Sequence, residues 1–389
     1  MSIRQWLPLV GLTCATFIFN TSEFMPIGLL TDIAASLGVS EPRAGLIISV
    51  YAWCVCLLSL PLMLLTARVD LRRLLLWVMA LFTVGQALSA VASGYWMLMG
   101  ARIIVACAHS IFWSIVSPLA VRMVGDRHKA LALSMIVTGS SIAMIFGLPL
   151  GRVIGLAVGW RMTFLCVGLF SLAVVIYLAS LLPRTPFHGS FSIKDLPDML
   201  QSRVLRGIYV ITLAFATAYF TGYSFIEPFL KQVSAFPEQR ITFTLMLFGA
   251  MGLVGSAAFS MWYRKHPRAF LTLALSGVTM ALFLLHPLSP YPVLTIAACA
   301  GWGIAVTAFN VAMQDEIIAN SHPDANAVAM SIFSGIFNLG IGSGTFIGGA
   351  VCDNWSISYI GYVGAGIGLV AIIIWQTTLY PALKAARKK

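Results

Sequence analysis

Long apolar stretches alternate with short polar or charged segments along nearly the whole chain. A helix needs about 20 apolar residues to cross the ~30 Å hydrocarbon core of a bilayer. Strands of a membrane barrel alternate apolar and polar residues instead and give no long apolar runs. The pattern therefore predicts twelve membrane-spanning helices, at 6–30, 44–66, 73–93, 97–121, 130–154, 161–182, 205–229, 240–262, 268–287, 291–316, 327–351 and 357–382.

Composition and charge support a membrane protein. The 389 residues are 59% hydrophobic and only 10% charged, whereas a soluble protein averages about 25% charged residues. The net charge of +11 does not indicate nucleic acid, because nearly all Lys and Arg residues lie in short loops. Placing the N-terminus inside puts most of them in cytoplasmic loops, as the positive-inside rule expects. Both termini are therefore predicted to be cytoplasmic.

The chain divides into two halves at its longest charged connection, Pro183–Arg206, which contains prolines, a glycine and four basic residues. We expect an N-terminal six-helix bundle at 1–183, a cytoplasmic linker at 184–204 and a C-terminal six-helix bundle at 205–389. The fifth span opens with ALALS at 130–134 and the eleventh with AVAMS at 327–331. Parallel repeats of six helices are typical of transporters whose solute site lies between the repeats near the midplane.

Glycines recur every four residues in the same two spans, and this spacing lets helices approach closely. We interpret them as parts of a sliding or rocking interface, with static packing as the alternative. Proline in the fifth span removes one backbone hydrogen bond and weakens the helix locally. The conformational residues predicted in these spans are Gly147, Pro149, Gly151, Gly155, Gly344 and Gly348.

The first span carries the polar run Asn20–Glu23. A carboxylate at the centre of a membrane span costs roughly 2.5–3.5 kcal/mol, so it is tolerated where it faces water, pairs with a cation or takes a proton. Arg102 lies at a matching depth in the fourth span, and His109 follows seven residues later on the same helical face. We predict that Glu23, Arg102 and His109 couple proton movement to transport. The alternatives are a permanent ion pair, an Arg102 that snorkels to the headgroups and a His109 that only packs between helices.

Uncharged polar groups and aromatic rings in the spans would suit a sugar. Interhelical hydrogen bonding is the common alternative role of Asn and Ser in membranes, and aromatic side chains often face lipid. Glu227, near the outer end of the seventh span, is a further candidate ligand of a hydroxyl group. The predicted solute-binding residues are Asn20, Trp53, Trp113, Ser140, Ser141, Tyr219, Tyr223, Glu227, Asn310, Gln314 and Asn338.

Several classes of function have no support in the sequence. It contains no Gly-x-x-x-x-Gly-Lys-Ser/Thr phosphate loop for ATP and no His-Glu-x-x-His metal motif. No set of nucleophile and base is convincing, so we expect neither an enzyme nor a cofactor or metal site. The seven cysteines lie in or beside apolar spans and are interpreted as small packing residues.

Three motifs together resemble the major facilitator superfamily, and in particular its twelve-helix drug/proton antiporter branch. Arg102 precedes a stretch of small residues, the fifth span runs from Gly139 through Gly155 to Gly-Trp-Arg at 159–161, and the loop after the second span is both acidic and basic. Within that branch, 23–30 and 112–120 look most like the bacterial arabinose-type sugar efflux transporters. The loop residues to which the resemblance gives a gating role are Arg68, Asp70 and Arg72.

The resemblance implies two pseudo-symmetric six-helix bundles, with the first and fourth spans lining one cavity. It also implies a secondary transporter that exports an arabinose-like or galactoside-like sugar by alternating access, in exchange for protons. The alternative is a multidrug/proton antiporter for lipophilic compounds. We expect a monomer in a bacterial inner membrane whose partners are the solute, protons and the lipid bilayer, with no nucleic acid.

Overall fold

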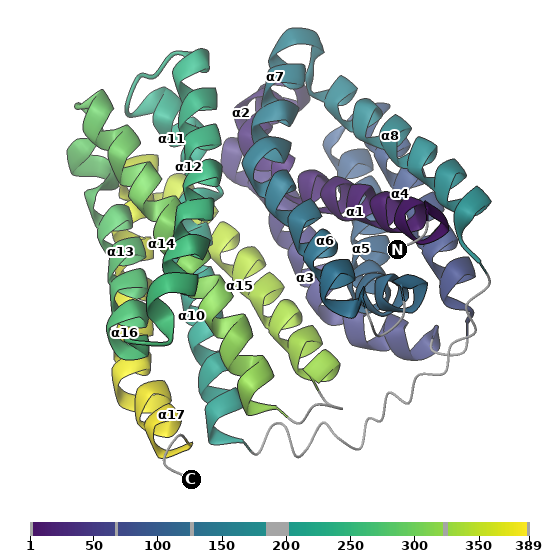
Figure 1. The fold of residues 1–389 in the computed structure, drawn as a ribbon. Coiled ribbons are helices and arrows are strands. Elements are labelled where there is room, and N and C mark those ends of the chain that lie inside the picture. Colours follow the sequence, from purple (N-terminus) through teal and green to yellow (C-terminus); the bar gives the residue numbers. More distant parts are fainter. Residues whose placement is uncertain (1–2, 67–68, 125–127, 184–201, 322–325, 387–389) are drawn as a thin grey trace. The chain divides into compact units, whose positions relative to one another are not determined.

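A computed structural model of the chain describes residues 3–66, 69–124, 128–183, 202–321 and 326–386, and every regular element in these ranges is a helix (Figure 1). Contacts divide the chain into two units. The first contains Met1–Val39 and Val50–Ser190, and the second contains Ser40–Ser49 and Phe191–Lys389. Most of the linker predicted at 184–204 lies outside the described residues, so the domain limits 1–183 and 205–389 stay a prediction.

The first part of the chain, up to residue 183, holds eight α-helices, a 3-10 turn η1 and a π-helical turn η3 among its described residues. Their bounds are α1 Ile3–Phe24, η1 Met25–Leu29, α2 Leu30–Leu37, α3 Glu41–Leu65, α4 Leu71–Ala90, α5 Tyr95–Val124, α6 Lys129–Ile142, η3 Ala143–Gly147, α7 Leu148–Val158 and α8 Trp160–Leu181.

The second part follows from residue 202. Its elements are α10 Arg203–Tyr223, α11 Ile226–Gln232, α12 Glu238–Ala258, η5 Phe259–Tyr263, α13 Pro267–Leu288, α14 Pro292–Asn320, α15 Asn326–Asn354, η7 Ile357–Tyr359, α16 Ile360–Ile374, η8 Trp375–Leu379 and α17 Tyr380–Ala386. Of the short ones, η7 is a 3-10 turn, and η5 and η8 are π-helical turns.

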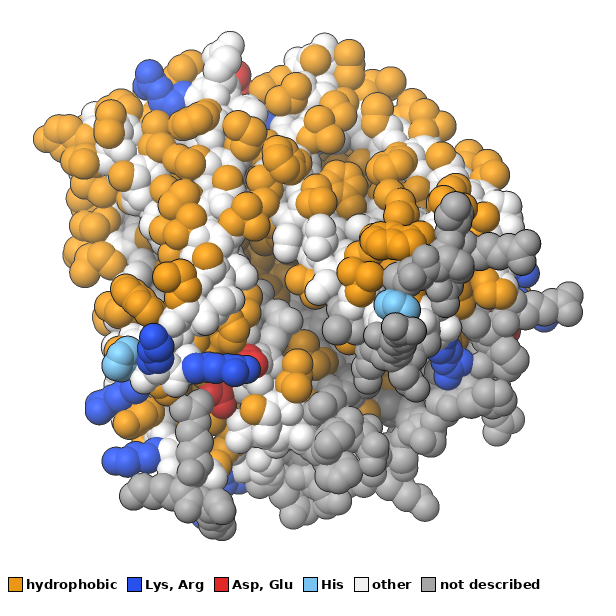
Figure 2. Space-filling view, in the orientation of Figure 1, with side chains coloured by type: hydrophobic (Ala, Val, Ile, Leu, Met, Phe, Trp, Pro, Cys, Tyr) orange, Lys and Arg blue, Asp and Glu red, His pale blue; other side chains and the backbone are white. Residues whose placement is uncertain are grey.

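Eleven helices in the described ranges are long and apolar enough to cross a membrane. The predicted first span is not among them, because the polar run Asn20–Glu23 lowers the hydropathy of α1. That helix is nevertheless 22 residues long and packs against α6 and α8. Hydrophobic side chains cover much of the face drawn in Figure 2, as a lipid-facing surface requires. The described part of the chain is all-helical and belongs to a multi-pass membrane protein, and a twelfth span formed by α1 stays a prediction.

The two halves repeat the same helix packing. In the first, α1 packs against α6 and α8, and α4 packs against α5 and α8. In the second, α10 packs against α15 and α16, and α13 packs against α14 and α16. In each half the first span packs against the fifth and sixth, and the third span packs against the fourth and sixth. This correspondence is the pseudo-symmetry that the internal repeat predicts.

The first long helix of each half breaks near a proline. α1 ends at Phe24 and passes through η1, which contains Pro26, into α2. α10 ends at Tyr223, and α11 follows with Pro228 in its first turn. Proline lacks a backbone N–H and disfavours helical geometry in the residue before it. The single spans predicted at 6–30 and 205–229 are therefore each two helices, with Glu23 just before one break and Glu227 just after the other.

The glycines with four-residue spacing face the first helix of their own half. A Cβ atom on Gly151 would lie 3.0 Å from the Cβ of Met25, in η1. On Gly344 it would lie 2.5 Å from the carbonyl oxygen of Thr217, in α10. Gly147 and Gly155 meet the side chains of Thr21 and Leu29 in the same way, and Gly348 meets Thr221 of α10. The stripes therefore allow close packing inside each half, and their part in gating stays a prediction.

The predicted span 130–154 is not one regular helix. It consists of α6, the π-helical turn η3 and α7, and Pro149 stands at the start of α7. Proline cannot donate the backbone hydrogen bond that a continuous α-helix needs at this point. The π-turn immediately before Pro149 is the local weakening that the sequence predicts.

We expect Gly344→Val to destabilise the protein more than Gly366→Val. The added side chain at position 344 would collide with the backbone of α10, whereas nothing lies within 4 Å of a Cβ at Gly366. Overpacking of this kind costs about 1–3 kcal/mol. Thermal unfolding in detergent should give a lower midpoint for Gly344→Val alone. Equal midpoints would contradict the close contact between α10 and α15.

Candidate functional site

Four consecutive polar residues, Asn20 to Glu23, occupy the last turn of α1 and all are buried. A polar group taken out of water needs a hydrogen-bond partner, and a charged one needs a partner even more. The partners come from α3, α4, α5 and α6, which pack around the end of α1. The polar run is therefore the centre of a candidate site within the first unit.

Arg102 of α5 reaches this run at Ser22. Its Nη1 atom donates to the Ser22 hydroxyl at 3.1 Å, and the amide of Gln86 donates to the same oxygen. The guanidinium carbon lies 4.3 Å from the centre of the Tyr51 ring, a cation–π arrangement. The side chain is only 1% exposed, so its charge is held inside the helix bundle.

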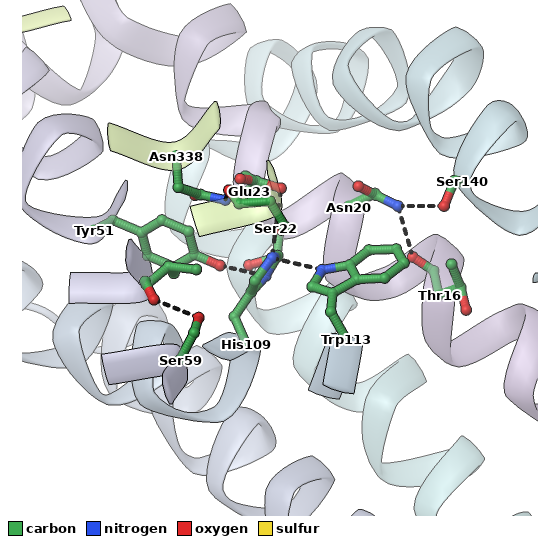
Figure 3. Close-up of polar contacts among 12 residues, drawn as sticks. Thr16, Asn20, Ser22, Glu23, Tyr51, Ser59, His109, Trp113, Ser140 and Asn338 are labelled. Atoms are coloured by element: carbon green, nitrogen blue, oxygen red, sulfur yellow. Dashed lines mark hydrogen bonds and ion pairs between the residues drawn. The ribbon is translucent and has the colours of Figure 1, made fainter. Parts of the chain in front are cut away.

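His109 lies at the centre of a second set of contacts. Its Nε2 atom is 3.7 Å from Oε2 of Glu23. The Tyr51 hydroxyl lies 2.7 Å from Nδ1, and the indole N–H of Trp113 donates to Nε2 at 2.7 Å. Figure 3 shows Tyr51 and Trp113 approaching the imidazole from opposite sides. All of these side chains are held by elements of the first unit.

The Trp113 contact assigns the proton on His109. An indole nitrogen can only donate, so Nε2 of His109 must present its lone pair. The ring proton then lies on Nδ1 and is donated to the Tyr51 oxygen. A second proton on the imidazole would occupy the lone pair that Trp113 uses, and the Trp113 hydrogen bond would break. The arrangement therefore links the protonation of His109 to the position of the Trp113 indole.

Glu23 and Arg102 attract each other electrostatically. The contact of Glu23 with Nε2 of His109, at 3.7 Å, becomes an ion pair only when the imidazole carries a second proton. Two guanidinium nitrogens of Arg102, Nε and Nη2, are buried with no hydrogen-bond partner in the described part of the chain. Charges interact strongly in such a low-dielectric interior. Adding or removing one proton among these groups therefore changes the forces on every other member of the cluster.

A stack of three phenylalanine rings supports the cluster. Phe19 lies parallel to Phe112 with ring centres 3.9 Å apart, and its centre is 4.2 Å from that of Phe82. At the next residue of α1, the Asn20 amide donates to the Ser140 hydroxyl at 2.9 Å. The rings fix α1 against α4 and α5, and the amide joins it to α6. The predicted residues Asn20, Ser140 and Trp113 therefore belong to the same neighbourhood as Glu23.

The second unit contains an aromatic cluster of its own. Tyr219 and Tyr223 of α10 lie with ring centres 4.8 Å apart, beside Phe248 and Trp302. The Tyr219 hydroxyl and the Trp302 indole N–H are buried with no hydrogen-bond partner in the described ranges. Flat apolar faces with unused polar atoms suit a ligand that is apolar on its faces and polar at its edges. The two tyrosines stand four residues apart and therefore lie on one face of α10.

The sequence matches the Major Facilitator Superfamily over residues 12–327, which is most of the chain. The chain belongs to the Major Facilitator Superfamily. Family membership makes it a membrane transporter of a small-molecule solute and indicates that it is not an enzyme.

Solved structures of transporters share the superfamily fold. The human organic anion transporter MFSD10 (TETRAN) is 14% identical, with a TM-score of 0.68 over 96% of this chain and 100% of that one. A variant of the nucleoside transporter NupG is 12% identical, with a TM-score of 0.77 over 95% and 99%. A bacterial homologue of the human lysosomal transporter Spinster, inward-facing and unoccupied, is 16% identical, with a TM-score of 0.75 over 99% and 94%. Sequence identities this low show that the fold is shared, and they do not identify the solute of this chain.

Six further residues of this superfamily member were predicted to bind solute, and the structure gives local contacts or burial for each of them. Gln314 donates to Asn310 at 2.9 Å within α14, and the Asn338 amide donates to Ser334 at 3.0 Å within α15. Glu227 is fully buried at the start of α11. Trp53 and Ser141 are partly exposed. Solute contact by any of these residues stays a prediction.

The predicted gating loop is only partly described, because Arg68 lies outside the described residues. The Asp70 side chain caps the N-terminus of α4 by accepting from the backbone N–H of Arg73 at 3.0 Å. The Arg72 guanidinium donates to the carbonyl oxygen of Ala179, in α8, at 2.7 Å. Both contacts lie within the first unit, and the gating role of the loop stays a prediction.

Four residues of these polar clusters were not predicted from the sequence. Ser22, Tyr51 and Gln86 hold Arg102 and His109 in place. Gln86 could have been predicted as a contact residue, because an amide inside an apolar span needs a hydrogen-bond partner. Glu316, near the end of α14, is buried and bonded by the Tyr263 hydroxyl and, at 3.0 Å, by the Asn320 amide. Glu316 could have been recognised in the sequence as a carboxylate at the edge of a predicted span.

We expect Tyr51→Phe to lower the thermal stability of the protein, because it leaves Nδ1 of His109 buried without its partner. An unsatisfied buried polar group costs about 1–3 kcal/mol. Tyr291→Phe is the matched control, since Tyr291 is 60% exposed. Thermal unfolding in detergent measures both. A Tyr51→Phe midpoint equal to that of the control would argue against the His109 hydrogen bond.

Proposed function

We propose that this superfamily transporter exports sugars from the cytoplasm in exchange for protons, by alternating access. The observation that carries the proposal is the buried cluster of Glu23, His109 and Arg102 in the first unit. Ionisable groups inside a membrane domain are rare and mark proton relays or substrate paths. A carboxylate 3.7 Å from an imidazole provides two proton acceptors within reach of each other.

The proton step uses the charge balance of the cluster. A proton that reaches Glu23 from outside cancels the negative charge that attracts Arg102. A proton passed to His109 displaces the Trp113 indole from Nε2, because that nitrogen can no longer accept. Either event changes the packing of α1 against α5 and favours the inward-facing state. Proton entry is thermodynamically able to drive export, since one charge crossing 100 mV is worth ~2.3 kcal/mol.

Uncharged polar groups and aromatic rings support a sugar as the solute. The first unit offers the Asn20–Ser140 pair and the Trp113 indole near the proton site. The second unit offers the Tyr219 hydroxyl and the Trp302 indole N–H, which are buried without partners in the described residues. A pyranose ring has apolar faces and hydroxyl groups around its edge, so it would use both kinds of group.

The working unit proposed is a monomer in a bacterial inner membrane with both termini in the cytoplasm. The concentration of Lys and Arg in alternate loops supports this orientation. Each half has its own apolar core and its own closely packed helix pairs. A single chain therefore supplies both halves that alternating access needs.

The alternative is proton-coupled export of lipophilic compounds, including cations. The aromatic cluster of Tyr219, Tyr223, Phe248 and Trp302 favours it, because aromatic faces attract cations. The two functions differ in their use of the unpartnered polar atoms. A sugar needs them, whereas a lipophilic compound does not.

We expect Glu23→Gln to abolish proton-driven export while solute binding remains. Glutamine keeps the size and hydrogen-bonding ability of the side chain but cannot release a proton. Purified protein in liposomes with an internal pH-sensitive dye and a preset pH gradient measures the coupling. Arabinose, a β-galactoside and a lipophilic cation are added separately. Proton movement should follow a sugar in the native protein and be absent in the variant.

Asp353→Asn is the control, because it removes an exposed carboxylate at the end of α15. It should behave as the native protein does. Native-like flux driven by the pH gradient in Glu23→Gln would end the coupling role of Glu23. Proton movement with the lipophilic cation alone would favour the multidrug alternative.

Tyr219→Phe separates the two solute classes. The change removes one buried hydroxyl and keeps the ring, so a sugar would lose one hydrogen bond worth about 0.5–1.5 kcal/mol. We expect sugar binding to weaken by about two- to tenfold, with lipophilic cation binding unchanged. Isothermal titration calorimetry on the purified protein measures both. Unchanged sugar binding would remove Tyr219 from the sugar site.

A further inference from the structure

A basic cavity lies in the second unit, where α13, η8 and α17 meet. Its volume is about 860 Å³, within the range of cavities that hold small ligands. Its walls include the cationic side chains Lys265, Arg268 and Lys384, the neighbouring His266, and the apolar groups of Leu273 and Trp375. None of the residues around it belongs to the clusters described above for proton or solute.

All the charged side chains that line the cavity are positive. No Asp or Glu residue is among its lining residues. In the described part of the chain, no ion pair is recorded for Lys265, Arg268 or Lys384. α13, which is 22 residues long, begins at the cavity with Pro267, so the positive end of its dipole adds to the field. These features favour an anion.

The side chains around the cavity are held in place before any ligand binds. The Arg268 guanidinium carbon lies 4.6 Å from the centre of the Tyr380 ring. Its Nη2 atom lies 3.4 Å from Oε1 of Gln376. The indole N–H of Trp375 donates to the Thr272 hydroxyl at 2.9 Å. Arg268 therefore presents a partly oriented fork, the geometry that recognises phosphate.

Two π-helical turns flank the cavity. η5 ends at Tyr263, two residues before Lys265, and η8 supplies Trp375 and Gln376 to the wall. Turns of this kind are rare and occur frequently at functional sites. Here η5 ends the helix that precedes Lys265, and η8 separates α16 from α17 at the wall of the cavity, which is an observation independent of its charge.

The cavity also has an exposed apolar wall. Leu273 lines it and is 63% exposed, and Met261 and Trp262 of η5 and Ile373, two residues before Trp375, are exposed as well. Figure 2 shows Lys and Arg side chains gathered with a His at the lower left, below a broad hydrophobic surface, where α17 lies in Figure 1. Some acidic side chains appear on that face too, but none is among the lining residues.

We propose that this cavity binds an anionic phospholipid. Its phosphate group lies among Lys265, Arg268 and Lys384, and one acyl chain runs along Leu273. Basic pockets between membrane helices bind anionic lipid headgroups in this way. A soluble phosphate compound offers the same headgroup chemistry, but it has no use for the exposed apolar wall. The inference does not depend on the solute or on proton coupling.

Native mass spectrometry of the purified, full-length transporter tests the proposal. Phosphatidylglycerol should bind more tightly than phosphatidylethanolamine. The variant Lys265→Gln/Arg268→Gln/Lys384→Gln should bind phosphatidylglycerol at least about tenfold more weakly, since each basic residue near an anionic lipid contributes about 1 kcal/mol. The control Arg73→Gln/Arg122→Gln/Arg240→Gln removes the same charge from exposed positions on α4, α5 and α12 that do not line the cavity and should bind as the native protein does.

Three results would overturn the proposal. The first is equal binding of phosphatidylglycerol by the native protein and the cavity variant. The second is an equal loss in the control variant, which would indicate only a general effect of charge. The third is competition by soluble glycerol 3-phosphate at concentrations matching those of the lipid, which would identify a soluble phosphate as the ligand. The substituted side chains are exposed, so thermal unfolding should show that both variants fold.

Discussion

The burial of charge at the end of α1 is the constraint on which the rest of the site depends. A carboxylate, a guanidinium and an imidazole lie inside an apolar helix bundle, where each would be costly alone. Ser22 and the Tyr51 ring hold Arg102, while Tyr51 and Trp113 hold His109. These partners stand on α1, α3 and α5, so the packing of the three helices is tied to the charge state of the cluster.

The architecture explains how such a cluster can act on the whole protein. Glycines let α7 and α15 pack closely against the beginning of their own half, so each half is closely packed around its first helix. Both first helices break beside a proline, near Glu23 in one half and Glu227 in the other. In the proposed mechanism, a proton at Glu23 would act at a point where the backbone is already irregular, and a small change there would move a helix end without disrupting the core.

Much of this was predictable from the sequence, and the reasons for the rest are physical. Hydropathy and the repeat predicted the helical class and the equivalent helix pairs, and the cost of an intramembrane charge selected Glu23, Arg102 and His109. The breaks at Pro26 and Pro228 were not predicted, because hydropathy does not register backbone geometry. Tyr51 and Gln86 were missed since their importance arises from contacts between distant helices. The sugar was inferred from the resemblance, with the uncharged polar groups and aromatic rings of the spans in support.

The most direct test is the number of protons released when a sugar binds. The purified protein in weakly buffered detergent solution is titrated with arabinose or a β-galactoside, and the pH change is recorded with the binding isotherm. The account predicts that binding of the exported sugar displaces about one proton in the native protein and none in Glu23→Gln. Binding that is tight, independent of pH and without proton release in the native protein would contradict it.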